Sequence, residues 1–229
     1  MAGNIVREID EWVRIQHVLI SVSDKRGLEI LVPGLLSCNQ ALKIFSTGGT
    51  YTEILRLLGP ETSRKHLTQV SDYTGQPETQ GGLVKTLDFK IYLGLLTETY
   101  NQAHQQDLER SHAVPIDMVV VNLYPFQKTV ANADVTVEEA RANIDIGGPC
   151  MVRASAKNYL RVASVTDPAD YEGIIKKLRI NGSRMDLKTR YALAKKAFAH
   201  TAEYDANIAR FLAAQSDDRV LSCYQPKGA

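Results

Sequence analysis

The segment that most limits the fold is the unbroken apolar run Met118–Val121, which ends at Asn122. A run without polar alternation is typical of a strand that is buried on both faces, as in a parallel sheet covered by helices on two sides. A strand with one face in water would alternate apolar and polar side chains. The run therefore predicts an α/β fold around a mostly parallel sheet.

Segments on both sides of this run alternate between strand and helix patterns. Short apolar runs predict strands at 17–22, 42–46 and 161–166, and apolar residues at helical spacing predict helices over 27–37 and 51–58. Strands that alternate with helices are typical of a parallel sheet.

The last third of the chain changes to a helical pattern. Asp167-Pro168 has the form of a helix start, and that helix should end near Asn181-Gly182. A longer helix is expected from Asp186 onward, because Leu187 and later apolar residues recur near helical spacing.

Polar clusters follow the expected strands at Val22, Phe45 and Val121. In parallel sheets, ligands bind outside the carboxyl ends of the strands, so these clusters should converge on one crevice. The Ser46–Thr50 turn lies between a strand and a helix, where its amides and hydroxyls could hold an anion. The alternative is a tight turn with a helix cap. Three further side chains could complete the anion site or belong to a solvated loop: Ser21, Ser23 and Lys25.

A second candidate region surrounds Gly147-Gly148, where Asp145 and Lys157 provide an ionisable pair. A glycine pair allows the backbone to approach a ligand closely, although a structural ion pair is the ordinary role of two such charges. Tyr124 could donate to an oxyanion or could simply lie at the edge of the core. Lys85, considered alone, has the character of a solvated lysine.

The composition limits the classes of partner that the chain is expected to bind. The chain has 229 residues and a formal net charge of +1, which argues against nucleic acid as the main partner and leaves a small anion possible. The three cysteines and five histidines form no metal-binding or disulfide pattern, so we expect no metal. The N-terminus is charged, unlike a signal peptide, and no apolar stretch approaches the ~20 residues of a membrane span. A cytoplasmic protein without a membrane partner is expected.

Seven motifs, taken in order, resemble the IMP cyclohydrolase domain of the bifunctional purine-biosynthesis enzyme that also carries AICAR transformylase. The resemblance runs from about Val18 to about Leu212. It implies a fold like methylglyoxal synthase: a Rossmann-type parallel sheet flanked by helices, with additional C-terminal helices, in a homodimer. The motifs are Ser21–Lys25, Ser46–Thr50, Val70–Gly75, Val84–Leu87, Asn122–Phe126, Ile144–Gly148 and Ala154–Asn158.

The resemblance also implies a domain layout. We expect an N-terminal extension over 1–16, a cyclohydrolase-like domain over 17–215 with a helical part from about 167, and a tail over 216–229. The transformylase half has no counterpart here, so no folate-dependent activity is expected, whether the chain is free-standing or a part of a bifunctional enzyme.

The family reaction closes a ring: the carboxamide nitrogen of FAICAR attacks the formyl carbon, and water leaves to give IMP. The resemblance implies that Asp145, Lys157, Tyr124 and Lys85 carry the chemistry, with Asp145 removing a proton and Lys157 and Tyr124 stabilising the developing oxyanion. No cofactor is needed. The implied substrate-binding residues, which hold a purine nucleotide monophosphate or an analogue, are Ser21, Ser23, Lys25, Thr47, Gly48, Gly49, Thr50, Thr86, Asn122, Ile146 and Gly147.

One stretch departs from the family pattern. Where the family has an arginine, a His-Pro pair and a second histidine, this chain has Leu83, Asp88-Phe89 and Tyr92. These changes alter chemical type within one short stretch, which indicates a remodelled pocket wall. Three functions stay open: an IMP cyclohydrolase, a specialised paralogue acting on a related formamido or amino-carboxamide substrate, and a non-catalytic nucleotide-binding protein.

Overall fold

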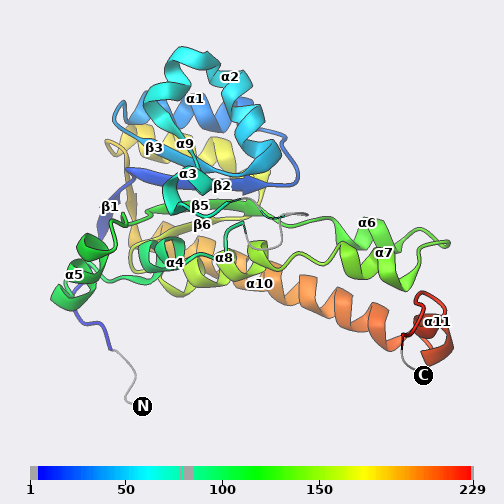
Figure 1. Ribbon diagram of the computed structural model, residues 1–229. Coiled ribbons are helices and arrows are strands. Elements are labelled where there is room, and N and C mark those ends of the chain that lie inside the picture. Colours follow the sequence, from blue (N-terminus) through cyan, green and yellow to red (C-terminus); the bar gives the residue numbers. More distant parts are fainter. Residues whose placement is uncertain (1–4, 78, 80–84, 228–229) are drawn as a thin grey trace.

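The computed structural model describes residues 5–77, 79 and 85–227. Over these residues a parallel sheet has the strand order β4–β3–β2–β5–β6 (Figure 1). The α/β fold with a parallel sheet is therefore confirmed. The strands of this sheet are β4 (Leu67–Gln69), β3 (Lys43–Ser46), β2 (His17–Val22), β5 (Met118–Asn122) and β6 (Ala163–Val165).

Strand β2 lies at the centre and fixes the register of its neighbours. Ile20 is opposite Ser46 on β3, and Val22 is opposite Asn122 on β5. The carboxyl ends of the three strands therefore reach the same edge of the sheet. The apolar run of β5 is buried, because β5 lies between β2 and β6 and helices cover both of its faces.

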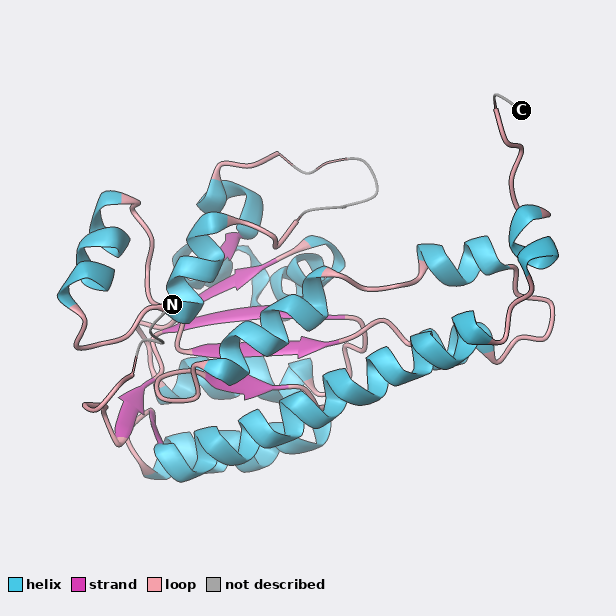
Figure 2. Ribbon diagram, turned by 90° about the horizontal axis from the view of Figure 1, so that it is seen from below, coloured by secondary structure: helices cyan, strands magenta, loops and turns pink. Residues whose placement is uncertain are grey.

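Two layers of helices enclose the sheet (Figures 1 and 2). One layer holds α1 (Leu28–Cys38), α2 (Gly48–His66) and α9 (Tyr171–Ile180), and the opposite layer holds α4 (Phe89–Leu96), α8 (Gly147–Lys157) and α10 (Leu187–Ala213).

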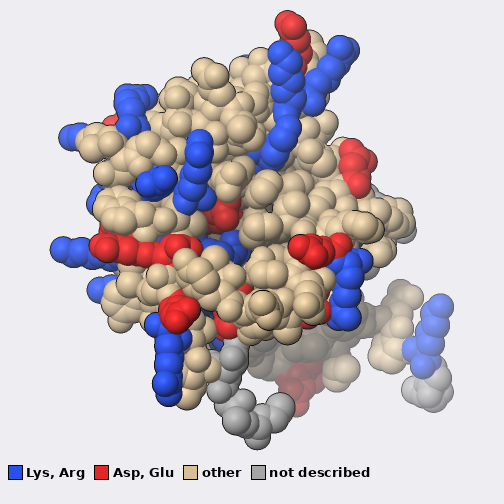
Figure 3. All heavy atoms as spheres, turned by 90° about the vertical axis from the view of Figure 1, so that its left-hand side faces the viewer, with Lys and Arg blue, Asp and Glu red and all other residues tan. Residues whose placement is uncertain are grey.

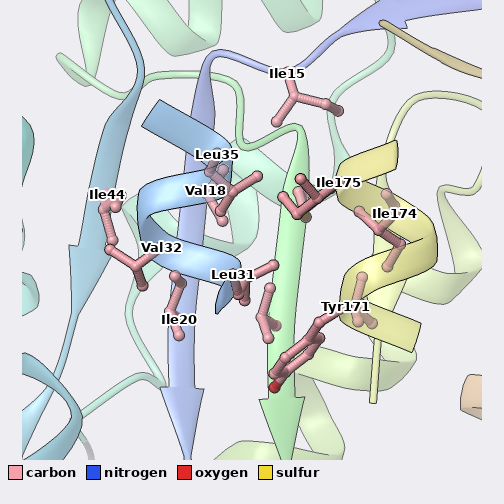
Figure 4. Packing of buried hydrophobic residues seen from close by; sticks show 14 of the residues in the cluster. Ile15, Val18, Ile20, Leu31, Val32, Leu35, Ile44, Tyr171, Ile174 and Ile175 are labelled. Carbon is pink, nitrogen blue, oxygen red and sulfur yellow. The ribbon is translucent and has the colours of Figure 1, made fainter. Parts of the chain in front are cut away.

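Each layer has its own apolar core. On the first face, side chains of α1 and α9 such as Leu31 and Ile175 pack onto Val18 and Ile20 of the sheet (Figure 4). Each fully buried aliphatic side chain of this kind contributes about 1.5–3 kcal/mol to folding. The second core contains Leu19 and Val119 beneath α8 and α10.

Shorter elements extend the domain beyond the sheet. Helices α6 (Phe126–Val130), α7 (Val137–Ala142) and α11 (Asp217–Leu221) lie with the far end of α10 (Figure 1). The guanidinium of Arg219 donates to the carbonyl of Val135, 2.9 Å away, and so joins α11 to the loop before α7. The remaining elements are β1 (Trp12–Arg14), α3 (Val70–Thr74), α5 (Gln102–Arg110), the 3-10 helix η2 (Pro168–Asp170) and β7 (Arg184–Asp186), which pairs antiparallel with β1.

Several expected boundaries are confirmed. The run at 118–122 is β5, Asp167 accepts a hydrogen bond from the amide of Ala169 at the start of η2, and Asp186 caps α10. Helix α2 begins at Gly48 and not at Tyr51, because the Ser46–Thr50 turn is itself the start of the helix. Strand β1 lies in the expected N-terminal extension, and α11 lies in the expected tail.

Two buried arginines hold distant segments together. Arg161 lies 3.2 Å from Asp117 and donates to the carbonyls of Gly94, Thr97 and Ile116. Arg190 has a fully buried side chain that donates only to backbone oxygens. Its acceptors are the carbonyls of Asp10, Glu11, Tyr159, Leu160 and Met185.

The outer surface mixes both signs of charge. On the face that carries β1 and α5, lysines and arginines are interspersed with aspartates and glutamates (Figure 3). This agrees with the formal net charge of +1. No helix among the described residues is both long and apolar enough to cross a bilayer.

Candidate active site

A pocket of about 360 Å³ opens at the carboxyl edge of the sheet. Its walls come from the ends of β2, β3 and β5, the start of α2, the segment at 85–87 and the start of α8. The expected convergence of the polar clusters on one crevice is therefore confirmed. The expected site residues that line it are Ser21, Ser23, Lys25, Thr47, Gly48, Gly49, Thr50, Lys85, Thr86, Asn122, Tyr124, Asp145, Ile146 and Gly147.

The N-terminus of α2 forms the cationic side of the pocket. The amides of Gly48 and Gly49 lie in the first turn of the helix, where backbone N–H groups have no intrahelical acceptor. A Cβ atom built on Gly48 would lie 3.2 Å from Nζ of Lys85, and one built on Gly49 would lie 3.9 Å from Nζ of Lys25. Gly48 has a φ of +45°, which disfavours a side chain. Two ammonium groups and a helix N-terminus thus provide a cradle for a phosphate-like anion.

Hydroxyl groups fix this cradle to the sheet. Thr50 Oγ1 accepts from the amide of Val22 and donates to its carbonyl, at 3.1 and 3.0 Å. The hydroxyls of Ser21 and Thr47 lie 3.1 Å apart. Thr50 therefore holds the end of β2 against α2 and also lines the pocket, and its expected contact with the ligand stays a prediction.

Asn122 shapes the loop after β2, and its expected contact with the reacting groups stays a prediction. Its Oδ1 accepts from the amides of Ser23 and Asp24 at 2.7 and 2.8 Å, and its Nδ2 donates to the carbonyl of Asp24 at 2.8 Å. The carboxamide borders the pocket, but its polar atoms shape the loop after β2. Through that loop it positions Ser23 and Lys25 beside the cradle.

Asp145 provides the anionic side of the pocket. Its Oδ1 accepts from the amide of Gly148, 2.9 Å away, at the start of α8. Burial raises the pKa of this carboxyl, and hydrogen bonds from the backbone of Gly148 and Tyr124 partly offset the rise. A Cβ built on Gly148 would lie only 2.5 Å from Asp145 Oδ2, so glycine allows the carboxylate to lie against the helix.

Tyr124 and Thr86 complete the wall near Asp145. Tyr124 lines the pocket and is 53% exposed. Thr86 is buried, and its Oγ1 would lie 2.6 Å from a Cβ built on Gly147. The segment that carries Lys85 therefore packs directly against the first turn of α8.

The expectation that Lys157 faces Asp145 across a glycine turn is wrong for this chain's own fold. Gly147 and Gly148 begin α8, and Lys157 is the last residue of that helix, exposed to solvent. Lys157 comes ten positions after Gly147 along α8, a rise of about 15 Å. Lys157 does not line the pocket.

The departures from the family pattern border the same region. Asp88 caps α4 by accepting from the amide of Lys90 at 2.8 Å, and Phe89 is 65% exposed. A second hollow of about 310 Å³ adjoins the main pocket, and Thr47, Asp88 and Phe89 are among the residues that line it. Tyr92 lies behind the site on α4, and burial raises the pKa of its phenol. Leu83 lies outside the described residues.

Sequence reasoning missed some of the wall. Val22, Leu87, Ile144 and Gly148 lie within the family motifs and could have been included, whereas the remaining three are apolar residues outside these motifs and have no chemical signature. The lining residues that we did not expect are Val22, Leu87, Val121, Ala142, Ile144, Gly148 and Met151. Within the described part of the chain, no three His, Cys, Asp or Glu side chains lie close enough to hold a metal ion.

Together, the fold and the pocket define an α/β protein with a polar pocket at the carboxyl edge of a parallel sheet. Residues 35–150 match the family described as the MGS-like domain, and this chain belongs to that family. Residues 155–227 match the family described as the AICARFT/IMPCHase bienzyme. The resemblance to the IMP cyclohydrolase part of that bienzyme is thereby confirmed.

Individual relatives agree with these matches. The bifunctional purine biosynthesis protein PurH of Prochlorococcus marinus (strain NATL2A) is 44% identical over 90% of this chain, and that of Magnetococcus marinus is 46% identical over 90%. The chain spans only 38% and 37% of the lengths of those proteins. The crystal structure of ForH superposes with a TM-score of 0.68 at 30% identity, covering 85% of this chain and 97% of ForH.

Proposed function

We propose that this chain is an IMP cyclohydrolase that closes the purine ring of FAICAR and releases water. The observation that carries the proposal is the arrangement of one pocket, with a phosphate cradle at the start of α2 and the carboxylate of Asp145 at the start of α8. The similarity to bifunctional PurH proteins supports the same reaction.

The size and polarity of the pocket suit a nucleotide monophosphate. A volume of about 360 Å³ is within the ~300–1,000 Å³ of ordinary small-molecule sites. A substrate phosphate between Lys25 and Lys85 would direct the other end of the molecule toward Tyr124 and Asp145. Because both reacting groups belong to one substrate, holding them in a reactive geometry supplies much of the acceleration.

Asp145 is the proposed general base. The carboxamide nitrogen is a weak nucleophile, so a carboxylate that removes its proton as the C–N bond forms would assist the attack. A pKa raised by burial makes this carboxylate a stronger base than an exposed aspartate. The oxyanion of the tetrahedral intermediate takes a proton from Tyr124 and becomes a hydroxyl. Asp145 then returns its proton to that hydroxyl, which leaves as water, and the former formamido N–H gives its proton to Tyr124 as the C=N bond forms.

The developing oxyanion needs donors other than Lys157, which lies at the far end of α8. Tyr124 and the amide of Gly147 at the start of α8 are the proposed donors, because the helix dipole favours negative charge there, while Lys85 is assigned to the phosphate. These groups could also assist the departure of water.

Purified protein incubated with FAICAR tests the proposal. We expect IMP to form at a rate that depends on enzyme concentration, with Asp145→Asn as the inactive control. Absence of IMP above the uncatalysed background from protein that still binds IMP would overturn the proposal and favour a non-catalytic nucleotide-binding role.

A specialised paralogue is the second candidate, favoured by Asp88 and Phe89 beside the adjoining hollow. It would close a ring on, or dehydrate, a related formamido or amino-carboxamide substrate. To decide between the candidates, kcat/KM is measured for FAICAR and for analogues whose heterocyclic ring differs from that of FAICAR. A higher value for an analogue favours the specialised paralogue. Homodimerisation remains a prediction, and sedimentation of the purified chain checks it.

A further inference from the structure

Tyr204 reaches the active-site aspartate from the C-terminal helix. It lies on α10, its side chain is 7% exposed, and its hydroxyl accepts a hydrogen bond from the backbone amide of Asp145, 2.7 Å away. No sequence pattern pointed to Tyr204 as part of the site, because it lies 59 positions from Asp145. The contact joins the MGS-like part of the chain, 35–150, to the part matched by the bienzyme family, 155–227.

The same tyrosine packs against the turn that carries Tyr124. The ring of Tyr204 meets Phe126 edge-on, with centroids 6.2 Å apart, and Phe126 meets Phe211 of α10 edge-on at 5.9 Å. The amide of Phe126 donates to the carbonyl of Tyr124 at 2.8 Å. One face of α10 therefore contacts the main chain at Asp145 and the turn that carries Tyr124.

Asp145 is thus fixed at two points. The hydroxyl of Tyr204 accepts a hydrogen bond from the Asp145 amide, and the amide of Gly148 donates a hydrogen bond to the Asp145 carboxylate. Burial raises the pKa of the Tyr204 phenol, and although the hydrogen bond from the Asp145 amide opposes this rise, the pKa stays above its ordinary value and the phenol remains neutral at physiological pH. A catalytic carboxylate must stay within about 0.5 Å of its productive position, and contacts of this kind provide that restraint.

We propose that Tyr204 is a positioning residue, which sets the orientation of the Asp145 carboxylate through the main chain. The inference rests on the proposed ring-closing function. Tyr204 does not line the pocket, so its hydroxyl acts through Asp145 and not on the substrate. Loss of the hydroxyl should therefore reduce turnover more than substrate affinity.

Tyr204→Phe is the test variant, because it removes the hydroxyl and keeps the ring against Phe126. Tyr191→Phe is the matched control: the same substitution on the same helix, at a side chain that is 48% exposed and outside the pocket. We expect Tyr204→Phe to lower kcat about tenfold with KM within about twofold, since one lost hydrogen bond corresponds to roughly this factor. The control should match wild type in both parameters.

The pH profile separates positioning from packing. A displaced Asp145 should titrate with a different pKa, so the acid limb of kcat against pH should shift in Tyr204→Phe and not in Tyr191→Phe. A variant that loses only thermal stability, with kcat per folded enzyme and the acid limb unchanged, would overturn the proposal.

Hydrogen exchange provides a readout that needs no turnover. In peptides that span 143–148, the Asp145 amide should exchange about tenfold faster in Tyr204→Phe than in wild type or in Tyr191→Phe, since it has lost its acceptor. If wild type makes no IMP, the proposed function fails and exchange alone decides the positioning role. Unchanged exchange in Tyr204→Phe would overturn that role.

Discussion

The carboxyl group of Asp145 is subject to opposing demands from folding and from chemistry. Its burial beside the start of α8 raises its pKa above the ordinary value of 3.8, which means that the ionised form costs folding free energy. The same ionised form is the base that the proposed reaction uses. The residue is therefore retained at some expense in stability.

Asp145→Asn should separate these two demands. Asparagine keeps the shape and the acceptor for Gly148, so we expect turnover to fall by about 10²–10⁴-fold while the Tm at neutral pH rises or stays constant. The wild-type protein loses stability as the pH rises through the raised pKa of folded Asp145, because the buried carboxyl then ionises. Below about pH 4 the carboxyl is protonated, so the Tm advantage of Asp145→Asn over wild type should vanish. Thermal melts from pH 3.5 to 8 check this, and a lower Tm for the variant at pH 7 would contradict it.

The two lysines of the catalytic hypothesis should now behave differently. Lys85→Met removes an ammonium beside Gly48, and we expect it to weaken IMP binding by about tenfold to a hundredfold in calorimetry. Lys157→Met changes an exposed side chain at the far end of α8 and should bind IMP as wild type does. Equal losses in both variants would mean that Lys157 reaches a pocket of another copy of the chain.

At the scale of residues, those that the sequence predicted for the site line the pocket, except for Lys157. The sequence did not predict the hydrogen bonds that these residues make within the protein. Motif order and strand ends were sufficient to bring Lys25, Asn122 and Asp145 to one pocket. The hydrogen bonds of Asn122 depend on the backbone path of the loop after β2. The position of Lys157, away from the pocket, depends on the helix that begins at Gly147. A glycine pair in a sequence does not distinguish a turn from a helix start.

At the scale of elements, a buried ion pair joins β5, β6 and α4. Asp117 and Arg161 form an ion pair of 3.2 Å at the starts of β5 and β6, and Arg161 also holds carbonyls at the end of α4. Burial raises the pKa of Asp117, and the guanidinium of Arg161 counteracts this rise. The pair fixes the edge of the sheet opposite the active site.

Arg161→Met should therefore be strongly destabilising. It leaves the carboxylate of Asp117 buried without its cation, so we expect a loss of about 3–5 kcal/mol in the free energy of unfolding. The loss should shrink at low pH, where Asp117 takes up a proton. Arg110→Met is the control, because its pair with Asp107 is exposed and contributes about 0–1 kcal/mol. Urea unfolding of both variants checks the prediction, and similar losses would contradict it.

Long elements were predictable, whereas short ones depended on their neighbours. Apolar runs and helical periodicity located β2, β5 and α10, because burial of a continuous face dominates their stability. Helices of five or six residues such as α6 and α7 are marginal alone and form through caps and tertiary contacts. For α7 a signal was present, since Thr136 and Glu139 form a capping box.

For the molecule as a whole, the C-terminal segments are part of the domain. Arg190 on α10 holds the backbone at Asp10 and Glu11, and β1 pairs with β7, so the N-terminal segment and the region at 184–190 stabilise each other. Alternating strands and helices predicted the sheet and its layers. They could not predict the projecting group of α6, α7 and α11, whose position follows from contacts such as Arg219 with Val135.

The two walls of the pocket have different origins along the chain. The cradle for the anion comes from residues 21–86, and the groups assigned to the chemistry come from 122–148. Mutations in one stretch can therefore change what is done to a ligand while the other stretch continues to capture its phosphate. Such a division favours divergence: a duplicated gene could acquire a new reaction in a few steps, because every intermediate would still recognise the same class of metabolite.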